Sequence, residues 1–124
     1  MAAETLGCEV AQIIKSLLFR SEKCNQPILI LASGINRVNE LIIEKIIGEK
    51  ILKADADSTR EITGFAIGGV PPLGHKQTIN HIFVDEDLLK FDKLWAAAGT
   101  PNAVFSLHSN ALANLTDGKV VAIK

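Results

Sequence analysis

Apolar residues occur in short runs along the chain, and polar or glycine-rich segments separate these runs. Residues 15–20 predict a strand, because three consecutive apolar side chains lie there without any sustained helical spacing. A polar turn at 21–26 leads into 27–32, an uninterrupted apolar run that is typical of a strand buried on both faces. We expect these two strands to form a hairpin.

The clearest helix is predicted at 40–47, where Asn39 can cap the start and Gly48 occupies the stop position. Asp57 is expected to cap a further helical turn that ends near Gly64. The other expected elements are a helical segment at 4–14 broken at Gly7, strands at 50–53, 78–85, 104–107 and 119–123, and a short helix at 110–115. Short helices mixed with irregularly connected strands predict an α+β or mixed α/β fold and argue against a doubly wound sheet.

Size and charge narrow the class of protein. The 124 residues predict one domain, 1–124, because domains usually contain ~100–200 residues. Apolar residues make up 48% of the chain and charged residues 22%, which is typical of a globular protein and excludes a disordered or fibrous one. The net charge of −1 argues against a general DNA-binding protein, although it is compatible with contact to a short stretch of nucleic acid.

The cysteines and the N-terminal residues predict the compartment. Cys8 and Cys24 lie in ordinary aliphatic sequence and match no metal-ligand spacing, so we interpret them as reduced thiols. Residues 1–4 lack the basic start and the long apolar segment of a secretory signal. The longest apolar run, 27–32, is far shorter than the ~20 residues that span a bilayer. We therefore expect a cytoplasmic protein without a membrane partner.

Lys15 is the first candidate for chemistry. In an extended strand, period-two geometry places it on the same face as the apolar side chains of Ile13, Leu17 and Phe19. Such an ammonium either snorkels at the margin of a sheet or forms a fixed positive charge in a pocket wall. In the second case it can hold a phosphate, a carboxylate or a carbonyl oxygen.

The segment from Gly64 to Gly74 is the second candidate, because it contains four glycines and two prolines. Glycines allow close approach to a ligand, and prolines restrict the loop so that its amides are already oriented. Such a loop can present N–H groups to a phosphate or a developing oxyanion, although most Gly/Pro loops are simple turns. Its spacing matches neither a P-loop nor the dinucleotide fingerprint.

Other polar residues give weaker signals. Thr100 and Asn102 follow a run of small residues and belong either to a ligand contact or to a tight turn. A capped strand exit and a solvated acidic turn explain the acidic residues at 85–87 and 92 better than paired catalytic carboxylates do. The histidines lack metal-ligand spacing, so we expect neither a metal nor a cofactor, and these residues are His75, His81 and His108.

These pieces together resemble a known family. The segments that carry the resemblance are Gln12 to Phe19, Ala54 to Asp55, Thr63 to Phe65, Gly68 to Gly74, Val84 to Leu89 and Trp95 to Val104. Their order and separations are similar to those of the YbaK/EbsC family of free-standing aminoacyl-tRNA deacylases, which is similar to the editing domain of bacterial prolyl-tRNA synthetase.

The resemblance implies a curved, barrel-like mixed sheet flanked by short helices. It also implies hydrolysis of the ester between a wrongly attached amino acid and the 3′ end of a tRNA, with tRNA for proline as the expected carrier and prolyl-tRNA synthetase as a further partner. Water attack is the implied mechanism, with loop amides stabilising the oxyanion. The implied catalytic residues are Lys15, Gly68 and Gly69, and the implied substrate contacts are Phe19, Val70, Pro71, Pro72, His75, Gly99, Thr100 and Asn102.

Two departures from the family pattern bear on the pocket. Members commonly begin with a further helix and strand before the segment that matches residues 4–7, so we expect either part of one pocket wall or an outer strand to differ. Some members carry a hydroxyl residue before the glycine that matches Gly99, where this sequence has Ala97 and Ala98. A smaller or less polar pocket follows, and alanine, cysteine, proline analogues and other small residues remain open as substrates. The alternative is an inactive binding module of the same fold that recognises tRNA 3′ ends, a nucleotide or a protein partner.

Overall fold

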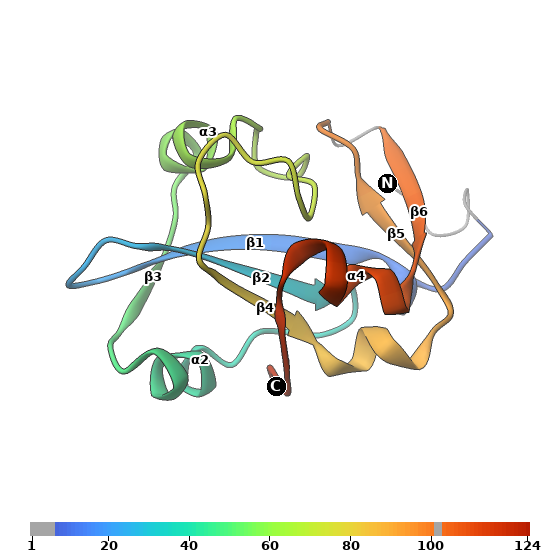
Figure 1. Ribbon diagram of the computed structural model, residues 1–124, viewed down its shortest axis with the longest axis horizontal. Coiled ribbons are helices and arrows are strands. Elements are labelled where there is room, and N and C mark those ends of the chain that lie inside the picture. Colours follow the sequence, from blue (N-terminus) through green and yellow to red (C-terminus); the bar gives the residue numbers. More distant parts are fainter. Residues whose placement is uncertain (1–6, 101–102) are drawn as a thin grey trace.

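A mixed five-stranded sheet lies at the centre of the computed structural model, which describes residues 7–100 and 103–124 (Figure 1). Its strands are β1 (Ile14–Ser21), β2 (Pro27–Ser33), β3 (Ile51–Lys53), β4 (His81–Asp85) and β7 (Lys119–Val121). They are ordered β3-β1-β2-β4-β7, with β1 antiparallel to both neighbours and the remaining pairs parallel. The predicted β1–β2 hairpin and the mixed α/β class are confirmed.

Strands β5 (Lys93–Ala97) and β6 (Val104–His108) form a separate antiparallel ribbon. The ribbon meets the chain just before β1 at a bridge between Ile13 and Trp95. Within residues 7–100 and 103–124, the main sheet is therefore open and does not close into the barrel that the family resemblance implies. Strand β5 was not predicted from the sequence.

Two helices, α2 (Glu40–Ile47) and α4 (Ser109–Thr116), agree with the sequence pattern, whereas the other helical elements differ from it. α2 begins after Asn39 and ends at Gly48, whose φ of 88° is left-handed, as predicted. The N-cap of α3 (Ala56–Thr63) is Asp55, which accepts a hydrogen bond from Ser58 N–H at 2.7 Å. The predicted cap, Asp57, lies instead in the first turn, where its negative charge favours the helix dipole.

The remaining helical elements are η1 (Val10–Gln12) and η2 (Glu86–Lys90). The helical segment predicted at 4–14 is, among the described residues, a single 3-10 turn at Val10–Gln12, because Ile13 pairs with Trp95 and Ile14 begins β1. The helical turn at Glu86–Lys90 was not predicted.

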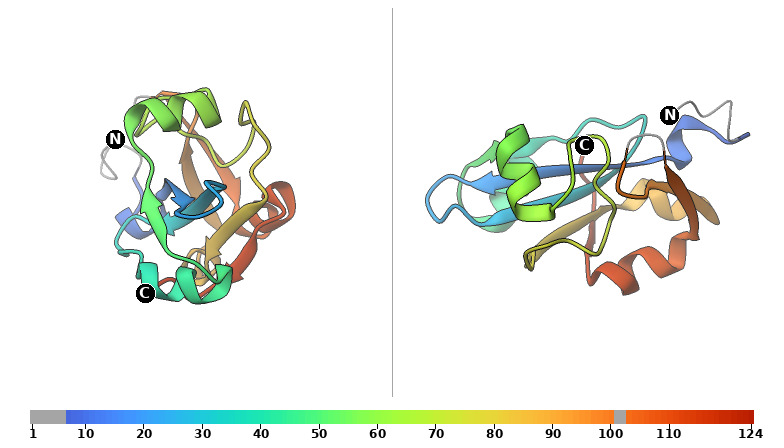
Figure 2. Two further views of the ribbon diagram at one scale, coloured as in Figure 1. Left: turned by 90° about the vertical axis from the view of Figure 1, so that its left-hand side faces the viewer. Right: turned by 90° about the horizontal axis from the view of Figure 1, so that it is seen from above.

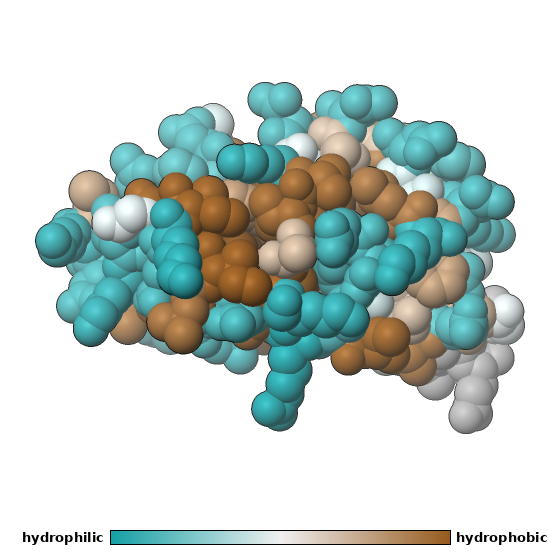
Figure 3. Space-filling view, turned by 90° about the horizontal axis from the view of Figure 1, so that it is seen from below, coloured by the Kyte–Doolittle hydropathy of each residue, from teal (hydrophilic) through white to brown (hydrophobic). Residues whose placement is uncertain are grey.

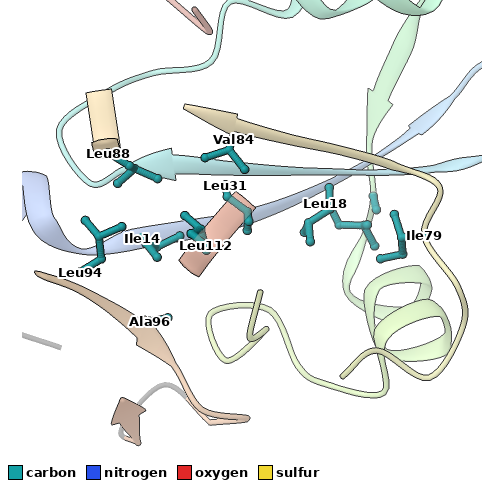
Figure 4. Packing of buried hydrophobic residues seen from close by; sticks show 11 residues of the cluster. Ile14, Leu18, Leu31, Ile79, Val84, Leu88, Leu94, Ala96 and Leu112 are labelled. Carbon is teal, nitrogen blue, oxygen red and sulfur yellow. The ribbon is translucent and has the colours of Figure 1, made fainter. Parts of the chain in front are cut away.

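β2 is buried on both faces, as its continuous apolar run predicts. Leu29 and Leu31 enter a first hydrophobic cluster, whereas Ile28, Ile30 and Ala32 enter a second cluster on the opposite face. All five side chains are fully buried. The first cluster also includes Ile14, Leu18, Ala54, Ile79, Val84, Leu88, Leu94, Ala96 and Leu112, most of which are labelled in Figure 4.

The elements around the sheet are divided between its two sides. In Figure 1, α3, the loop that follows it and the β5–β6 ribbon lie above β1, whereas α2 lies below. The end-on view in Figure 2 shows the same separation of α3 from α2. The segments that contain most of the candidate site residues therefore collect on one side of β1.

The opposite side of the molecule carries apolar side chains among polar ones (Figure 3). Two residues of α2, Leu41 and Ile46, are 66% and 41% exposed. None of the described helices has the length and the apolar character that crossing a membrane requires.

Candidate active site

A pocket of about 420 Å³ opens along one edge of β1. It is bounded by residues 13–18, by α3 and the two residues before its cap, by the loop at 67–70, and by Ala97 of β5. Most of the lining side chains are apolar, among them Ile14, Leu18 and Val70. A mostly apolar cavity with a few polar groups is typical of a small-molecule binding site.

The edge of β1 beside the pocket lacks a strand partner over part of its length. β3 pairs with β1 only at residues 19–21, and Ala54 N–H extends this pairing to the Leu18 carbonyl at 3.0 Å. At the other end, β5 meets the chain at Ile13. The main chain between Ile13 and Leu18 therefore borders the pocket directly, and an unpaired strand edge can bind an added chain.

Lys15 lies at this edge, lines the pocket and is half-buried. Its ammonium donates a hydrogen bond to the main-chain carbonyl of Asn36, 2.5 Å away in the loop after β2. Burial and the neighbouring Arg37 guanidinium lower the pKa of Lys15, while the Asp85 carboxylate opposes this shift. An ammonium has three donors, so donors beyond the one used for Asn36 can bind a carbonyl or phosphate oxygen.

Asn36 is itself fixed by two carboxylates. Its side chain is 5% exposed, and its amide nitrogen donates to Asp85 and Asp87, each at 2.8 Å. An amide nitrogen carries two hydrogens, so it can serve both carboxylates at once. These bonds anchor the loop and, with it, the carbonyl that holds Lys15.

The two carboxylates are integrated into the fold. Asp85 is 1% exposed and accepts hydrogen bonds from the N–H groups of Ser33 and Asp87, each at 3.0 Å. Lys90, Asn36 and Lys124, in that order, hold the pKa of Asp87 well below its ordinary value. Lys90 and Lys124 lie 2.9 and 3.0 Å from its carboxylate oxygens. The structure thus agrees with the prediction that Asp85 caps a strand exit.

The loop after α3 brings two of its predicted site residues to the pocket. Gly68, whose φ of 89° is left-handed, and Val70 both line it. Gly69 is buried behind them, and its carbonyl accepts a hydrogen bond from Gly99 N–H at 3.0 Å. Lys15, Gly68 and Val70 therefore lie around one cavity although they are far apart in the sequence.

The side chain of His75 forms a hydrogen bond inside this loop. Its Nε2 lies 2.7 Å from the carbonyl of Pro71, and because a carbonyl oxygen only accepts, the ring nitrogen is the donor. Pro71 and Pro72 are buried. None of these three predicted substrate contacts lines the pocket, and the bond between His75 and Pro71 lies within the loop itself.

The remaining predicted site residues have other surroundings. Phe19 is 4% exposed and packs in the second cluster, so its side chain serves the core on the face away from Ile14 and Leu18. Gly99 and Thr100 pack against the back of Gly69. Asn102 lies outside the described residues.

The pocket includes residues that the sequence reasoning did not single out. Ser16 is the most notable, because its hydroxyl is buried and has no hydrogen-bond partner among the described residues. The alternation of side chains on β1 could have placed it beside Ile14 and Leu18. The others are Ile13, Ile14, Leu17, Leu18, Lys53, Ala54, Thr59 and Ile67, and most of them gave no signal beyond an apolar or small side chain. Ala97, which the family resemblance connects with the pocket, lines it as well.

The arrangement suits the binding of an apolar group beside Lys15, the loop at 67–70 and the main chain of β1. Within residues 7–100 and 103–124, no three His, Cys, Asp or Glu side chains are grouped so that they could hold a metal ion. Cys8 and Cys24 are free thiols. Positioning and electrostatic stabilisation are the catalytic contributions that such residues can make.

Comparison with known proteins gives this geometry a context. Residues 1–115 match the sequence model of a family described as aminoacyl-tRNA editing domain. The uncharacterized protein YwhH of Bacillus subtilis is 33% identical over 119 residues, which cover 96% of this chain and 74% of that protein. The proline–tRNA ligase of Limosilactobacillus fermentum is 33% identical over 91 residues, which cover 70% of this chain and 16% of the ligase.

Solved structures agree in fold. A protein proposed to be a trans-editing enzyme for prolyl-tRNA synthetase is 43% identical, with a TM-score of 0.93 over 98% of this chain and 76% of that one. The hypothetical protein APE2540 is 26% identical, with a TM-score of 0.89 over 98% of this chain and 79% of that one.

Proposed function

Because the chain belongs to the aminoacyl-tRNA editing domain family, we propose that it hydrolyses the ester bond of mischarged aminoacyl-tRNA. The observation that carries this proposal is the shared pocket of Lys15, Gly68 and Val70. An aminoacyl ester is already activated relative to an amide. A positioned water and well-placed donors are therefore sufficient chemistry for its hydrolysis.

In the proposed mechanism, the aminoacyl group enters the apolar pocket and its carbonyl approaches the loop at Gly68 and Val70. Gly69 N–H donates to the Ala66 carbonyl at 3.0 Å. In this mechanism the main-chain N–H groups of Gly68 and Val70 therefore stabilise the negative charge that develops on the carbonyl oxygen when water attacks. The Lys15 ammonium orients the aminoacyl end through an oxygen of the ester or of the terminal nucleotide. Pro71, Pro72 and His75 support the loop, and Asn36 supports Lys15.

The proposed substrate is a small amino acid on tRNA for proline, bound through the 3′ acceptor end. The proline–tRNA ligase relative and the structural neighbour proposed to act for prolyl-tRNA synthetase support this choice of tRNA. The apolar lining of the pocket supports a small apolar side chain, which a synthetase cannot reject by binding alone. The proposed setting is the cytoplasm, where aminoacyl-tRNA is made, with prolyl-tRNA synthetase as a further partner.

The test is a panel of mischarged tRNAs incubated with the protein, with release of free amino acid as the measurement. The panel contains tRNA for proline charged with alanine or cysteine, the correctly charged prolyl form as a control, and a second tRNA charged with alanine or cysteine. Release of alanine or cysteine from tRNA for proline above the spontaneous rate, with the prolyl form spared, supports the proposal. Binding of the tRNAs without release would support the inactive binding module instead.

A further inference from the structure

The hydrogen bonds of β1 reveal the direction of its main-chain groups. Ser21 N–H donates to the Gln26 carbonyl on the β2 side at 2.9 Å, whereas the Leu18 carbonyl accepts from Ala54 N–H on the β3 side at 3.0 Å. Along a strand, the main-chain groups of successive residues point to opposite edges. Odd-numbered residues of β1 therefore face β2, and even-numbered residues face β3 or the pocket.

Ser16 is an even-numbered residue in the unpaired part of this edge. Ser16 lies opposite Leu31 of β2. Because the odd-numbered residues of β1 form the hydrogen bonds to β2, Ser16 and Leu31 are a non-hydrogen-bonded pair. On the other side, β3 pairing stops at Leu18 and the bridge to β5 lies at Ile13. Its N–H and C=O therefore face the pocket, and no described residue forms a hydrogen bond with either group.

We propose that the main chain of Ser16 binds the aminoacyl group of the substrate as if this group were one residue of an added antiparallel strand; this inference rests on the proposed function. An α-aminoacyl ester carries an ammonium donor and a carbonyl acceptor on the two sides of one carbon, as a strand residue does. Two such opposed residues exchange two hydrogen bonds. The Ser16 carbonyl accepts from the α-ammonium, and Ser16 N–H donates to the ester carbonyl oxygen.

This docking determines where the amino-acid side chain lies. Directly opposed residues of an antiparallel pair place their side chains on the same face. The side chain of an L-amino acid bound to Ser16 therefore extends to the face of Ile14 and Leu18, which belong to the first cluster. The site thus selects a free α-amino group and a small apolar side chain, whereas an N-acylated aminoacyl group loses one of the two bonds.

Amide hydrogen exchange measured by NMR tests this inference. The ligand is an adenosine analogue that carries L-alanine at its 3′ position through a non-hydrolysable amide, and the control ligand is its N-acetyl form. In the free protein, Ser16 N–H should exchange at least about 100-fold faster than Leu17 N–H, which faces β2. The alanyl analogue should slow exchange at Ser16 at least about tenfold, leave Leu17 unchanged and outcompete the acetylated form.

Each outcome has a defined meaning. Protection of Ser16 N–H in the free protein, or exchange that the alanyl analogue does not change, would overturn the inference even if mischarged tRNA is hydrolysed. Protection by the analogue without hydrolysis of any tRNA would overturn the proposed function and still support the docking site.

As a second test, Ser16→Pro removes the N–H at a strand edge where proline is tolerated. The folded variant should deacylate at least about tenfold more slowly. A folded variant with the rate of the parent would contradict the inference.

Discussion

The carbonyl of Gly69 accepts a hydrogen bond from the N–H of Gly99, 3.0 Å away, and this bond joins the loop after α3 to the turn between β5 and β6. A Cβ added at Gly69 would lie 2.8 Å from Thr100 Cα and 2.9 Å from the Gly99 carbonyl oxygen. Only a glycine fits this contact without a shift of the backbone. The contact holds the loop in the position from which Gly68 and Val70 line the pocket.

Gly69→Ala should therefore lower both stability and activity. The added methyl group overpacks a contact between two backbones, and we expect a loss of ~1–3 kcal/mol in the free energy of unfolding. Urea unfolding measures the stability, and hydrolysis of the best tRNA of the panel measures the activity. Unchanged stability would show that the two loops do not meet as described.

Gly68→Ala separates strain from function when it is compared with Gly74→Ala. Both glycines belong to the same loop and have left-handed φ values, 89° and 80°. Alanine should thus cost a similar ~1–2 kcal/mol at each position. Only Gly68 lines the pocket, so only Gly68→Ala should slow single-turnover hydrolysis beyond what its lower stability explains. Equal hydrolysis rates for the two variants would mean that Gly68 has no role in catalysis and that the loop is only a structural turn.

Asn36→Ala should impair the function of Lys15. The variant loses the amide bonds to Asp85 and Asp87, which should lower the free energy of unfolding by ~2–3 kcal/mol and release the carbonyl that holds the ammonium. Deacylation should fall at least about tenfold, because a catalytic group displaced by 1 Å can cost ~10²-fold.

Asn39→Ala is the matched control for this variant, since Asn39 caps α2 a few residues later, whereas the described hydrogen bond of the Lys15 ammonium is to Asn36. It should lose ~1 kcal/mol of stability and retain the deacylation rate. In a Lys15→Ala background, Asn36→Ala should have no further effect on the rate. A full additional loss in that background would mean that Asn36 acts independently of Lys15.

Chelator and reductant should leave both melting and deacylation unchanged. The described residues contain no group of three metal-ligating side chains, and Cys8 and Cys24 are free. Thermal melting and amino-acid release, each measured with excess chelator and with reductant, check this expectation. A large loss in either treatment would reveal a metal or a disulfide that the protein requires.

The helices and strands that were predicted correctly are those that residues within or next to the element determine. The apolar run of β2 indicates burial on both faces by itself, and Asn39 and Gly48 mark the ends of α2. β5 was not predicted, because Ala96 and Ala97 have small side chains that favour no strand and owe their burial to tertiary packing. The cap at Asp55 was assigned to Asp57 because both aspartates satisfy the same local pattern.

The candidate site was predictable only in part, for a similar reason. Lys15 and Gly68 stand out by residue type, and the structure brings them to one pocket. Phe19 belongs to the core because the faces of β1 depend on which elements cover them, and periodicity alone does not determine this. The role of the Ser16 main chain depends on where β3 ends and β5 begins, which no local pattern reveals.

Single-turnover hydrolysis of mischarged tRNA by the parent and by Lys15→Ala, with melting measured in parallel, tests the account most directly. Loss of the charge-assisted bond to the Asn36 carbonyl should cost ~1.5–3 kcal/mol of stability, which is less than the ~5–15 kcal/mol typical of a folded domain, so the variant should fold. Its rate should fall at least about tenfold, equivalent to ~1.4 kcal/mol in the barrier. Lys15→Arg should restore little of it, because a planar guanidinium cannot place its charge at the same point. A folded Lys15→Ala variant that hydrolyses the ester as fast as the parent would contradict the assignment of this site.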